Sequence, residues 1–123
     1  MTAIAATSIT CFGDGSPTRE FLYCDDLADA CVFLMNNYDS PEIINVGSDG
    51  EVTIKELVET IKEKVNFEGD IIWDTSKPNG TPLRKLSYDK IKNLGWQAKI
   101  NLEVGLTKTI LWYLENRKTY TRN

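Results

Sequence analysis

The strongest constraint on the fold is a helix start at Thr53. Glu56 follows three residues later, the spacing of a capping box in which the two side chains bind the first free N–H groups of a helix. Apolar residues then recur at helical spacing, at Ile54, Leu57, Val58, Ile61 and Val65. The sequence therefore predicts an amphipathic helix that buries one face.

Turn-forming residues separate this helix from other short elements. Strands are predicted at 8–12, 19–23, 43–46 and 70–74. Three more helices are predicted: one capped by Asp25 or Asp26 and ending near Asn36 and Asn37, one from Ser87 through Leu94 that Gly95 terminates, and one capped by Asn101. The expected fold is α/β of the α+β-like kind, a small mixed domain of short strands and three or four helices.

Each helix should bury an apolar face. In the first these residues are Leu27, Ala30, Cys31, Leu34 and Met35, and in the last they are Leu102, Leu106, Ile110, Trp112, Tyr113 and Leu114. In the strand at 70–74, Ile71 and Trp73 fall on one side and Ile72 on the other. With 123 residues, 41% of them hydrophobic, we expect a single domain over 1–123 in which 1–7 and 117–123 are loose.

Composition excludes several functional classes. The formal net charge of -4 gives no global positive field for nucleic acid, and no apolar run reaches the roughly 20 residues that cross a bilayer. We therefore expect no nucleic-acid or membrane partner, and a cytoplasmic location. Cys11, Cys24 and Cys31 lack the paired spacing of a zinc site, and the chain has no histidine. We expect reduced, buried thiols, no metal, and no cysteine- or serine-based catalysis.

Two turn-rich loops carry arginines. Gly80–Leu86 presents Arg84 and Lys85 in a segment stiffened by prolines, and Arg19 follows the turn at Gly13–Pro17. Guanidinium groups match phosphate oxygens in pairs, so the two loops predict a site for an anionic ligand such as a diphosphate. The alternative is that these cations are solvated surface charges, as most isolated arginines and lysines are.

Other patterns have simple interpretations. The turn Gly13-Asp14-Gly15 follows a strand, but Thr18 replaces the third glycine of the dinucleotide fingerprint and Pro17 interrupts the expected helix, so we reject that function. The three aspartates between 25 and 29 fit a helix cap and first turn better than a metal cluster. Phe12 is more typical of a core, although its place beside the turn also allows it to cover a base or a sugar ring.

The order of several motifs resembles the C-terminal substrate domain of GDP-L-fucose synthase, an extended short-chain dehydrogenase/reductase of the NAD-dependent epimerase/dehydratase superfamily. Four segments carry the resemblance: Phe12–Ala28, Asn45–Ser48, Lys77–Pro82 and Leu94–Trp96. It covers nearly the whole chain, from about Ser8 to Asn116. The resemblance implies the C-terminal lobe of a nucleotide-sugar enzyme that epimerises GDP-4-keto-6-deoxy-mannose at two carbons and reduces its ketone with NADPH.

By position, the resemblance implies a substrate site at Phe12, Arg19, Asn79 and Arg84. Arg19 would contact the nucleotide diphosphate, and Phe12 stands where the family usually has tryptophan. Asn79 stands where aspartate is usual, and Arg84 and Leu83 stand where the family has its substrate-binding lysine and an arginine. These differences keep positive charge in the loop but move it, so the guanine and sugar specificity of the family does not transfer directly.

In the family that the chain resembles, the cofactor-binding and catalytic groups belong to a Rossmann lobe, which lies upstream of the matched region. This chain has no glycine fingerprint, no Tyr-x-x-x-Lys group in a suitable context and no histidine. Hydride transfer requires a bound nicotinamide and an activated tyrosine. We therefore expect no catalytic residue, no cofactor in this chain and no activity by itself, with NADP expected for a complete family member.

Three hypotheses stay open at this point. In the first, the chain is a truncated or fragment substrate-binding lobe that binds GDP or a GDP-sugar weakly. In the second, a separate Rossmann-domain partner completes an epimerase/reductase and covers an apolar face. In the third, the chain is a non-catalytic interaction module, such as a homo-oligomer.

Overall fold

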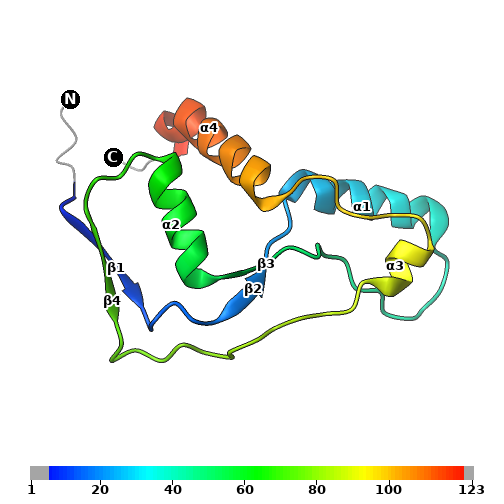
Figure 1. The fold of residues 1–123 in the computed structure, drawn as a ribbon. Helices are drawn as coiled ribbons and strands as arrows, with labels where there is room; N and C mark the ends of the chain where they lie inside the picture. Colours follow the sequence, from blue (N-terminus) through cyan, green and yellow to red (C-terminus); the bar gives the residue numbers. More distant parts are fainter. Residues whose placement is uncertain (1–5, 121–123) are drawn as a thin grey trace. The chain divides into compact units, whose positions relative to one another are not determined.

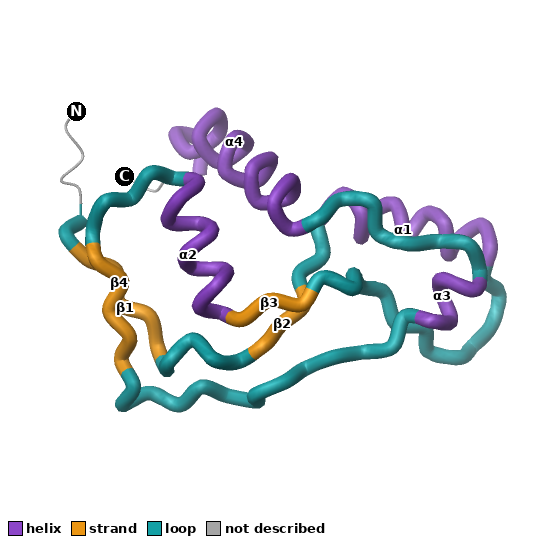
Figure 2. The backbone as a smooth tube through the Cα atoms, viewed as in Figure 1, coloured by secondary structure: helices purple, strands orange, loops and turns teal. Residues whose placement is uncertain are grey.

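The computed structural model of the chain describes residues 6–120. Within this range it has four helices and four short strands, which confirms the predicted small mixed α/β fold (Figures 1 and 2). In chain order these elements are β1 (Ser8–Phe12), β2 (Thr18–Glu20), α1 (Cys24–Asn37), β3 (Glu51–Thr53), α2 (Ile54–Lys64), β4 (Asp70–Asp74), α3 (Asp89–Asn93) and α4 (Leu102–Tyr120). None of the described helices has the length and apolarity of a membrane span.

The contacts between residues divide the chain into two compact units. Of the described residues, unit 1 contains those up to Arg19 together with Val52–Arg84. Unit 2 contains Glu20–Glu51 and the residues from Lys85 onward. The single domain expected over 1–123 stays a prediction, and each unit is described by itself below.

Unit 1 is built on a parallel pair of strands. Ser8 of β1 stands opposite Asp70 of β4, and the register continues to Phe12 opposite Asp74. The side chains of β4 alternate as predicted, with Ile71 and Trp73 partly buried and Ile72 more exposed. A parallel pair cannot be joined by a tight turn, and here the long connection between its strands includes α2 (Figure 1).

The start of α2 has the predicted capping box. The Glu56 N–H donates to Thr53 Oγ1 at 3.1 Å, and the Thr53 N–H donates to Glu56 Oε2 at 2.8 Å. The next N–H groups donate to the turn after β1: Ile54 to the Pro17 carbonyl and Lys55 to the Gly15 carbonyl, both at 2.9 Å. The free N–H groups of the helix start thus fasten the Gly13–Pro17 turn to α2.

Unit 2 has a small core of Ala30, Tyr88, Ile91 and Trp96, which joins α1 to α3 and to the segment after α3. The predicted cap of α1 is wrong. The helix begins at Cys24 after Tyr23, and neither Asp25 nor Asp26 caps it.

Asp26, which is 5% exposed, instead has a tertiary role. Its Oδ2 accepts the N–H groups of Lys99 at 3.2 Å and Ile100 at 2.8 Å, just before α4. The carboxylate satisfies two backbone donors that lie more than 70 positions further along the chain, which is why a local capping rule does not find it.

The face that α1 buries also differs from the prediction. Ala30 and Leu34 belong to the core or pack against it, but Leu27, Cys31 and Met35 are exposed, Met35 by 83%. Cysteines 11, 24 and 31 are free thiols, as expected, but Cys24 and Cys31 are exposed rather than buried. The apolar positions of α1 form two neighbouring stripes, and the core covers the one that contains Ala30.

Two shorter predictions in unit 2 are wrong. Residues 43–46 do not form a strand: Ile43 is 90% exposed, whereas Ile44 and Val46 pack against the core as irregular backbone. Helix α3 starts after Tyr88 with no side-chain cap, so Ser87 is not its cap. Gly95 does end this segment as predicted, with a φ of +105°.

The start of α4 is as predicted and its later part is not. Asn101 caps the helix, because its Oδ1 accepts the Val104 N–H at 2.9 Å. The side chains at 112–114 were expected to be buried but are more than half exposed. The helix also continues through Tyr120, so residues 117–120 are helical rather than loose, whereas 1–5 and 121–123 lie outside the described residues.

Candidate functional site

The two arginine-bearing segments lie side by side within unit 1. Beyond the β1–β4 pair, the two segments that follow these strands meet again. Thr18 and Leu83 form a parallel bridge there, and the Thr18 N–H donates to the Pro82 carbonyl at 2.9 Å. Arg19 and Arg84 each follow directly after one partner of this bridge, so they occupy neighbouring backbone positions on the two segments. We call residues 12–19 and 77–84 the facing segments.

The Arg19 side chain lies along these segments. Its Nη1 donates to the Thr18 carbonyl at 2.7 Å, and its Nη2 is 3.8 Å from the place that a Cβ on Gly80 would occupy. Gly80 has a φ of +77°, which an L side chain rarely adopts. The loop therefore passes directly against the guanidinium group.

Neither arginine is neutralised by a carboxylate. Within residues 6–120, Arg19 and Arg84 form no ion pair, whereas Lys85, Lys90 and Lys92 each pair with an acidic side chain. Two cations whose charges are not compensated and which stand at neighbouring positions repel one another, and an anion placed between them relieves the repulsion.

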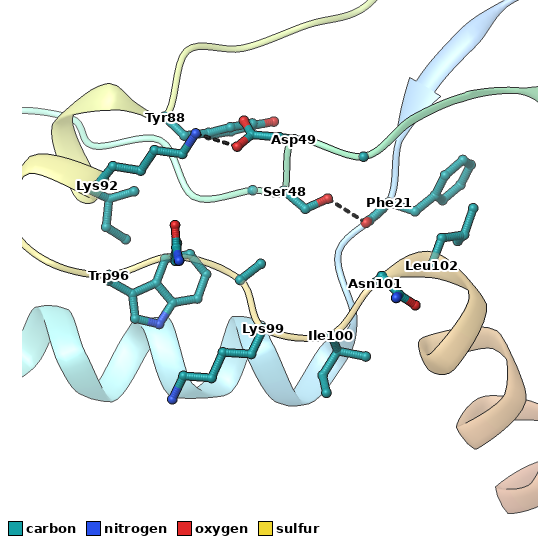
Figure 3. A pocket seen from close by; sticks show the side chains of 15 residues that line it. Phe21, Ser48, Asp49, Tyr88, Lys92, Trp96, Lys99, Ile100, Asn101 and Leu102 are labelled. Atoms are coloured by element: carbon teal, nitrogen blue, oxygen red, sulfur yellow. Dashed lines mark hydrogen bonds and ion pairs between the residues drawn. The ribbon is translucent and has the colours of Figure 1, made fainter.

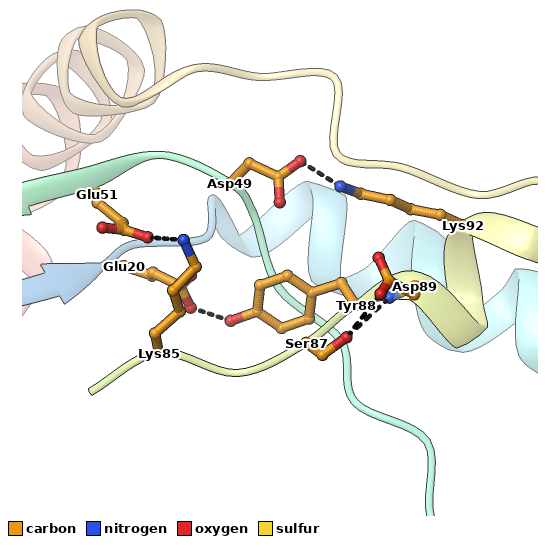
Figure 4. A network of polar contacts seen from close by, with 8 residues as sticks. All are labelled: Glu20, Asp49, Glu51, Lys85, Ser87, Tyr88, Asp89 and Lys92. Carbon is orange, nitrogen blue, oxygen red and sulfur yellow. Dashed lines mark hydrogen bonds and ion pairs between the residues drawn. The ribbon is translucent and has the colours of Figure 1, made fainter. Parts of the chain in front are cut away.

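Lys85 was expected to be the second cation of the loop, and the structure assigns it elsewhere. It belongs to unit 2, where its Nζ forms an ion pair with Glu51 (Figure 4). The contact with Glu51 raises the pKa of Lys85, and Glu20 and Asp49 add to this effect. The cationic pair of unit 1 is therefore Arg19 and Arg84.

Asn79 connects the facing segments at their other end. Its Oδ1 accepts the Asp14 N–H at 2.8 Å, and a Cβ on Gly13 would overlap the same oxygen. Asp14 closes its own turn by accepting the Ser16 N–H at 2.9 Å, and contact with the Ser16 side chain, followed by this N–H, lowers the pKa of its carboxyl. Sequence reasoning missed Asp14, although an Asp two residues before a Ser in a glycine turn is typical of such a turn.

Phe12 is not a core residue. Its ring is 69% exposed at the end of β1, and the Lys77 Nζ lies 5.8 Å from the ring centroid. An exposed aromatic ring beside a cation can stack against a planar group. All four residues predicted for the site, Phe12, Arg19, Asn79 and Arg84, thus lie on the facing segments of unit 1.

Unit 2 has a separate pocket of about 240 Å³ (Figure 3). Its walls come from the Gly47–Gly50 loop and from the segment between α3 and α4, with the rings of Tyr88 and Trp96 inside. Three of its polar side chains are engaged within unit 2: Ser48 Oγ donates to the Phe21 carbonyl at 2.8 Å, and Lys92 pairs with Asp49. These contacts hold the walls of the pocket together.

The residues described here do not fit a dinucleotide cofactor. Such a cofactor requires a glycine-rich turn that leads from a strand into the N-terminus of a helix. In this chain the turn after β1 leads into β2 instead.

Comparison with known proteins shows which proteins this chain is similar to. Residues 1–47 match the NAD dependent epimerase/dehydratase family. The chain is 51% identical over 111 residues to GDP-L-fucose synthase 1 of Arabidopsis thaliana, a match that covers 90% of this chain and 34% of the relative. It is 38% identical over 128 residues to GDP-L-fucose synthase of Escherichia coli, covering 97% of this chain and 40% of the relative.

The chain is similar in sequence and fold to one part of the GDP-L-fucose synthases. A solved GDP-L-fucose synthetase from Naegleria fowleri, bound to NADP, matches with a TM-score of 0.85 and 35% identity over 91% of this chain and 36% of that one. A GDP-mannoheptose C4 reductase from Campylobacter jejuni with NADP bound matches with a TM-score of 0.76 and 33% identity, over 88% of this chain and 35% of that one. The chain thus spans about a third of the length of the GDP-L-fucose synthases of plants that it matches.

Proposed function

We propose that this chain forms a nucleotide-sugar-binding lobe in which Arg19 and Arg84 hold the diphosphate of a GDP-sugar. The observation that carries the proposal is the bridge between Thr18 and Leu83, which sets the two arginines at neighbouring positions. Each guanidinium offers several N–H donors in a flat fork that matches two phosphate oxygens. Neither residue forms an ion pair within the described chain, so apart from the Arg19 Nη1 contact with the Thr18 carbonyl their donors are available to an anion.

The rest of the ligand extends along the facing segments. Phe12, at the other end of segment 12–19, offers an exposed ring on which a purine base or a sugar can stack. The choice of GDP-sugars rests on the relatives, whose names include GDP-L-fucose synthase and GDP-mannoheptose C4 reductase. We expect binding to be weak, because a clamp of two arginines and one aromatic ring covers only part of such a ligand.

Calorimetric titration with GDP and GDP-mannose tests the proposal. Replacing Arg19 or Arg84 with alanine removes a charge-assisted contact and should weaken binding by roughly 1.5–3 kcal/mol, or about 10- to 150-fold. Arg117→Ala is the matched control, because it removes the same charge from α4 in unit 2. Equal heats for wild type, Arg19→Ala and Arg84→Ala, or no heat with the wild type, would remove the proposal.

A further inference from the structure

Asn79 and Asp14 are 65 positions apart in the sequence, yet they join the facing segments of unit 1. The Asn79 Oδ1 accepts the backbone N–H of Asp14 at 2.8 Å. The Asn79 side chain also lies close enough to the Asp14 carboxyl to contribute, after the larger effect of Ser16, to lowering its pKa. One amide therefore faces both the backbone and the carboxylate of a single turn.

The residues next to this contact are those of the proposed site. Phe12 precedes the Gly13–Asp14 turn, and Gly13 has a φ of +83° with no space for a Cβ beside the Asn79 oxygen. On the other segment, Gly80 follows Asn79 and passes against the Arg19 guanidinium. A movement of Asn79 would thus shift the aromatic ring on one side and the contact surface of the arginine on the other.

Resting on the proposed function, we infer that Asn79 and Asp14 form a positioning pair. They hold the facing segments together so that Phe12 and Arg19 are placed for the ligand, and they contact no ligand themselves. Asn79 was predicted from the resemblance to be a substrate-binding residue, whereas its amide oxygen is directed to the backbone of the opposite segment. Its effect on binding is therefore exerted through its neighbours.

The pairing of an amide with a carboxylate suggests a sharp test. An amide carries both an acceptor and donors, so it can accept the Asp14 N–H while it faces the Asp14 carboxylate without repulsion. Aspartate at position 79 has the same shape and keeps the acceptor, but at neutral pH it places a second negative charge beside Asp14. When one of two close carboxylates is protonated, it becomes a donor and the pair is compatible again.

The experiment measures the dissociation constant for GDP by calorimetry at two pH values for four proteins. These are the wild type, Asn79→Asp, the exchanged variant Asp14→Asn with Asn79→Asp, and the control Asn66→Asp. Asn66 has a φ of +51° and follows α2, near the start of β4, whereas the site lies where β4 ends. Aspartate tolerates that backbone about as well as asparagine, so the control adds the same charge to unit 1 at small structural cost.

We expect Asn79→Asp to bind GDP about tenfold more weakly than the wild type near pH 7.5 and within about threefold of it near pH 5. Taking the ratio to wild type at each pH removes the titration of the ligand itself. The exchanged variant restores one amide and one carboxylate and should return to within about threefold of the wild type at both pH values. Thermal unfolding of each variant at both pH values separates this effect from a loss of stability caused by the same repulsion.

The outcomes separate this inference from the proposed function. If the wild type binds GDP and Asn79→Asp binds equally well at both pH values, the positioning pair is overturned and the arginine clamp is unaffected. If Asn79→Asp is weakened but the exchanged variant is not rescued, Asn79 contacts the ligand directly and the inference is again wrong. If the wild type binds no GDP, both fall together. Thermal unfolding of each variant, with equal midpoints expected, excludes misfolding as the cause.

Discussion

The indole N–H of Trp96 donates a hydrogen bond of 2.9 Å to the carboxylate of Asp29. Trp96 belongs to the buried core of unit 2, so Asp29→Ala leaves a buried donor without this acceptor. We expect the free energy of unfolding to fall by about 1–3 kcal/mol in urea denaturation. Asp39→Ala, which removes an exposed aspartate after α1, should stay within about 0.5 kcal/mol of the wild type. Equal stability of the two variants would contradict this assignment.

Asp26 should be more sensitive to the loss of its oxygen than to the loss of its charge. Both N–H groups that it accepts, from Lys99 and Ile100, reach the same Oδ2. Asp26→Ala should therefore lower the free energy of unfolding by about 3 kcal/mol, whereas Asp26→Asn, which can present one oxygen to the same two donors, should lose about half as much. The same urea measurement decides, and an asparagine variant as unstable as the alanine variant would sink the interpretation.

Two glycines of one loop give a matched pair. A Cβ on Gly47 would overlap the ring of Tyr88, whereas a Cβ on Gly50 would meet nothing closer than the Ser48 Oγ at 3.9 Å. Gly47→Ala should then destabilise unit 2 by about 1–3 kcal/mol, because the buried ring has to move, and Gly50→Ala should be nearly neutral. Thermal unfolding of the two variants measures this difference. A Gly47→Ala protein with the wild-type midpoint would show that the loop packs elsewhere.

Tyr88 predicts a loss of stability at alkaline pH. Its ring is 6% exposed and its hydroxyl donates to the Glu20 carboxylate; burial, and then this contact, raise its pKa to about 12 from 10.0 (Figure 4). A folded pKa above the unfolded one means that the folded state binds the proton more tightly. The stabilisation is therefore complete below pH 10 and is lost as the pH rises toward about 12.

The difference between wild type and Tyr88→Phe isolates this effect from other groups that titrate at high pH. The difference in the free energy of unfolding between the two proteins should decrease between pH 10 and about 12. Tyr113→Phe is the matched control, because it removes the hydroxyl of a half-exposed tyrosine on α4. A difference for Tyr88→Phe that stays constant over this range would exclude the proposed coupling.

Local signals in the sequence predicted the local structure well. The Thr53–Glu56 box, the Asn101 cap and the end at Gly95 each depend on residues within one helical turn, and all three were found. The predictions that needed a distant partner did less well. The sequence predicts Asp26 as a cap because it lies at the start of a helical pattern, whereas its two backbone donors lie more than 70 positions away. The apolar run at 43–46 is not paired with a strand in the described structure.

The candidate site shows the same division. Turn chemistry and charge located Arg19 and Arg84 in their loops, but their proximity depends on register. The β1–β4 pairs are offset by 62 positions and the Thr18–Leu83 bridge by 65, so the second segment has three extra residues. Asn79 lies in that longer stretch and contacts Asp14. Spacing within a single sequence does not reveal such an insertion, because it is defined only by the pairing of the two segments.

The preference for GDP over GMP tests the central proposal most directly, since these ligands share the base and differ in the diphosphate. If Arg19 and Arg84 hold the diphosphate, the wild type should bind GDP at least about tenfold more tightly than GMP, and the double variant Arg19→Ala with Arg84→Ala should bind both equally. Equal affinities in the wild type, or a preference that survives in the double variant, would contradict the account.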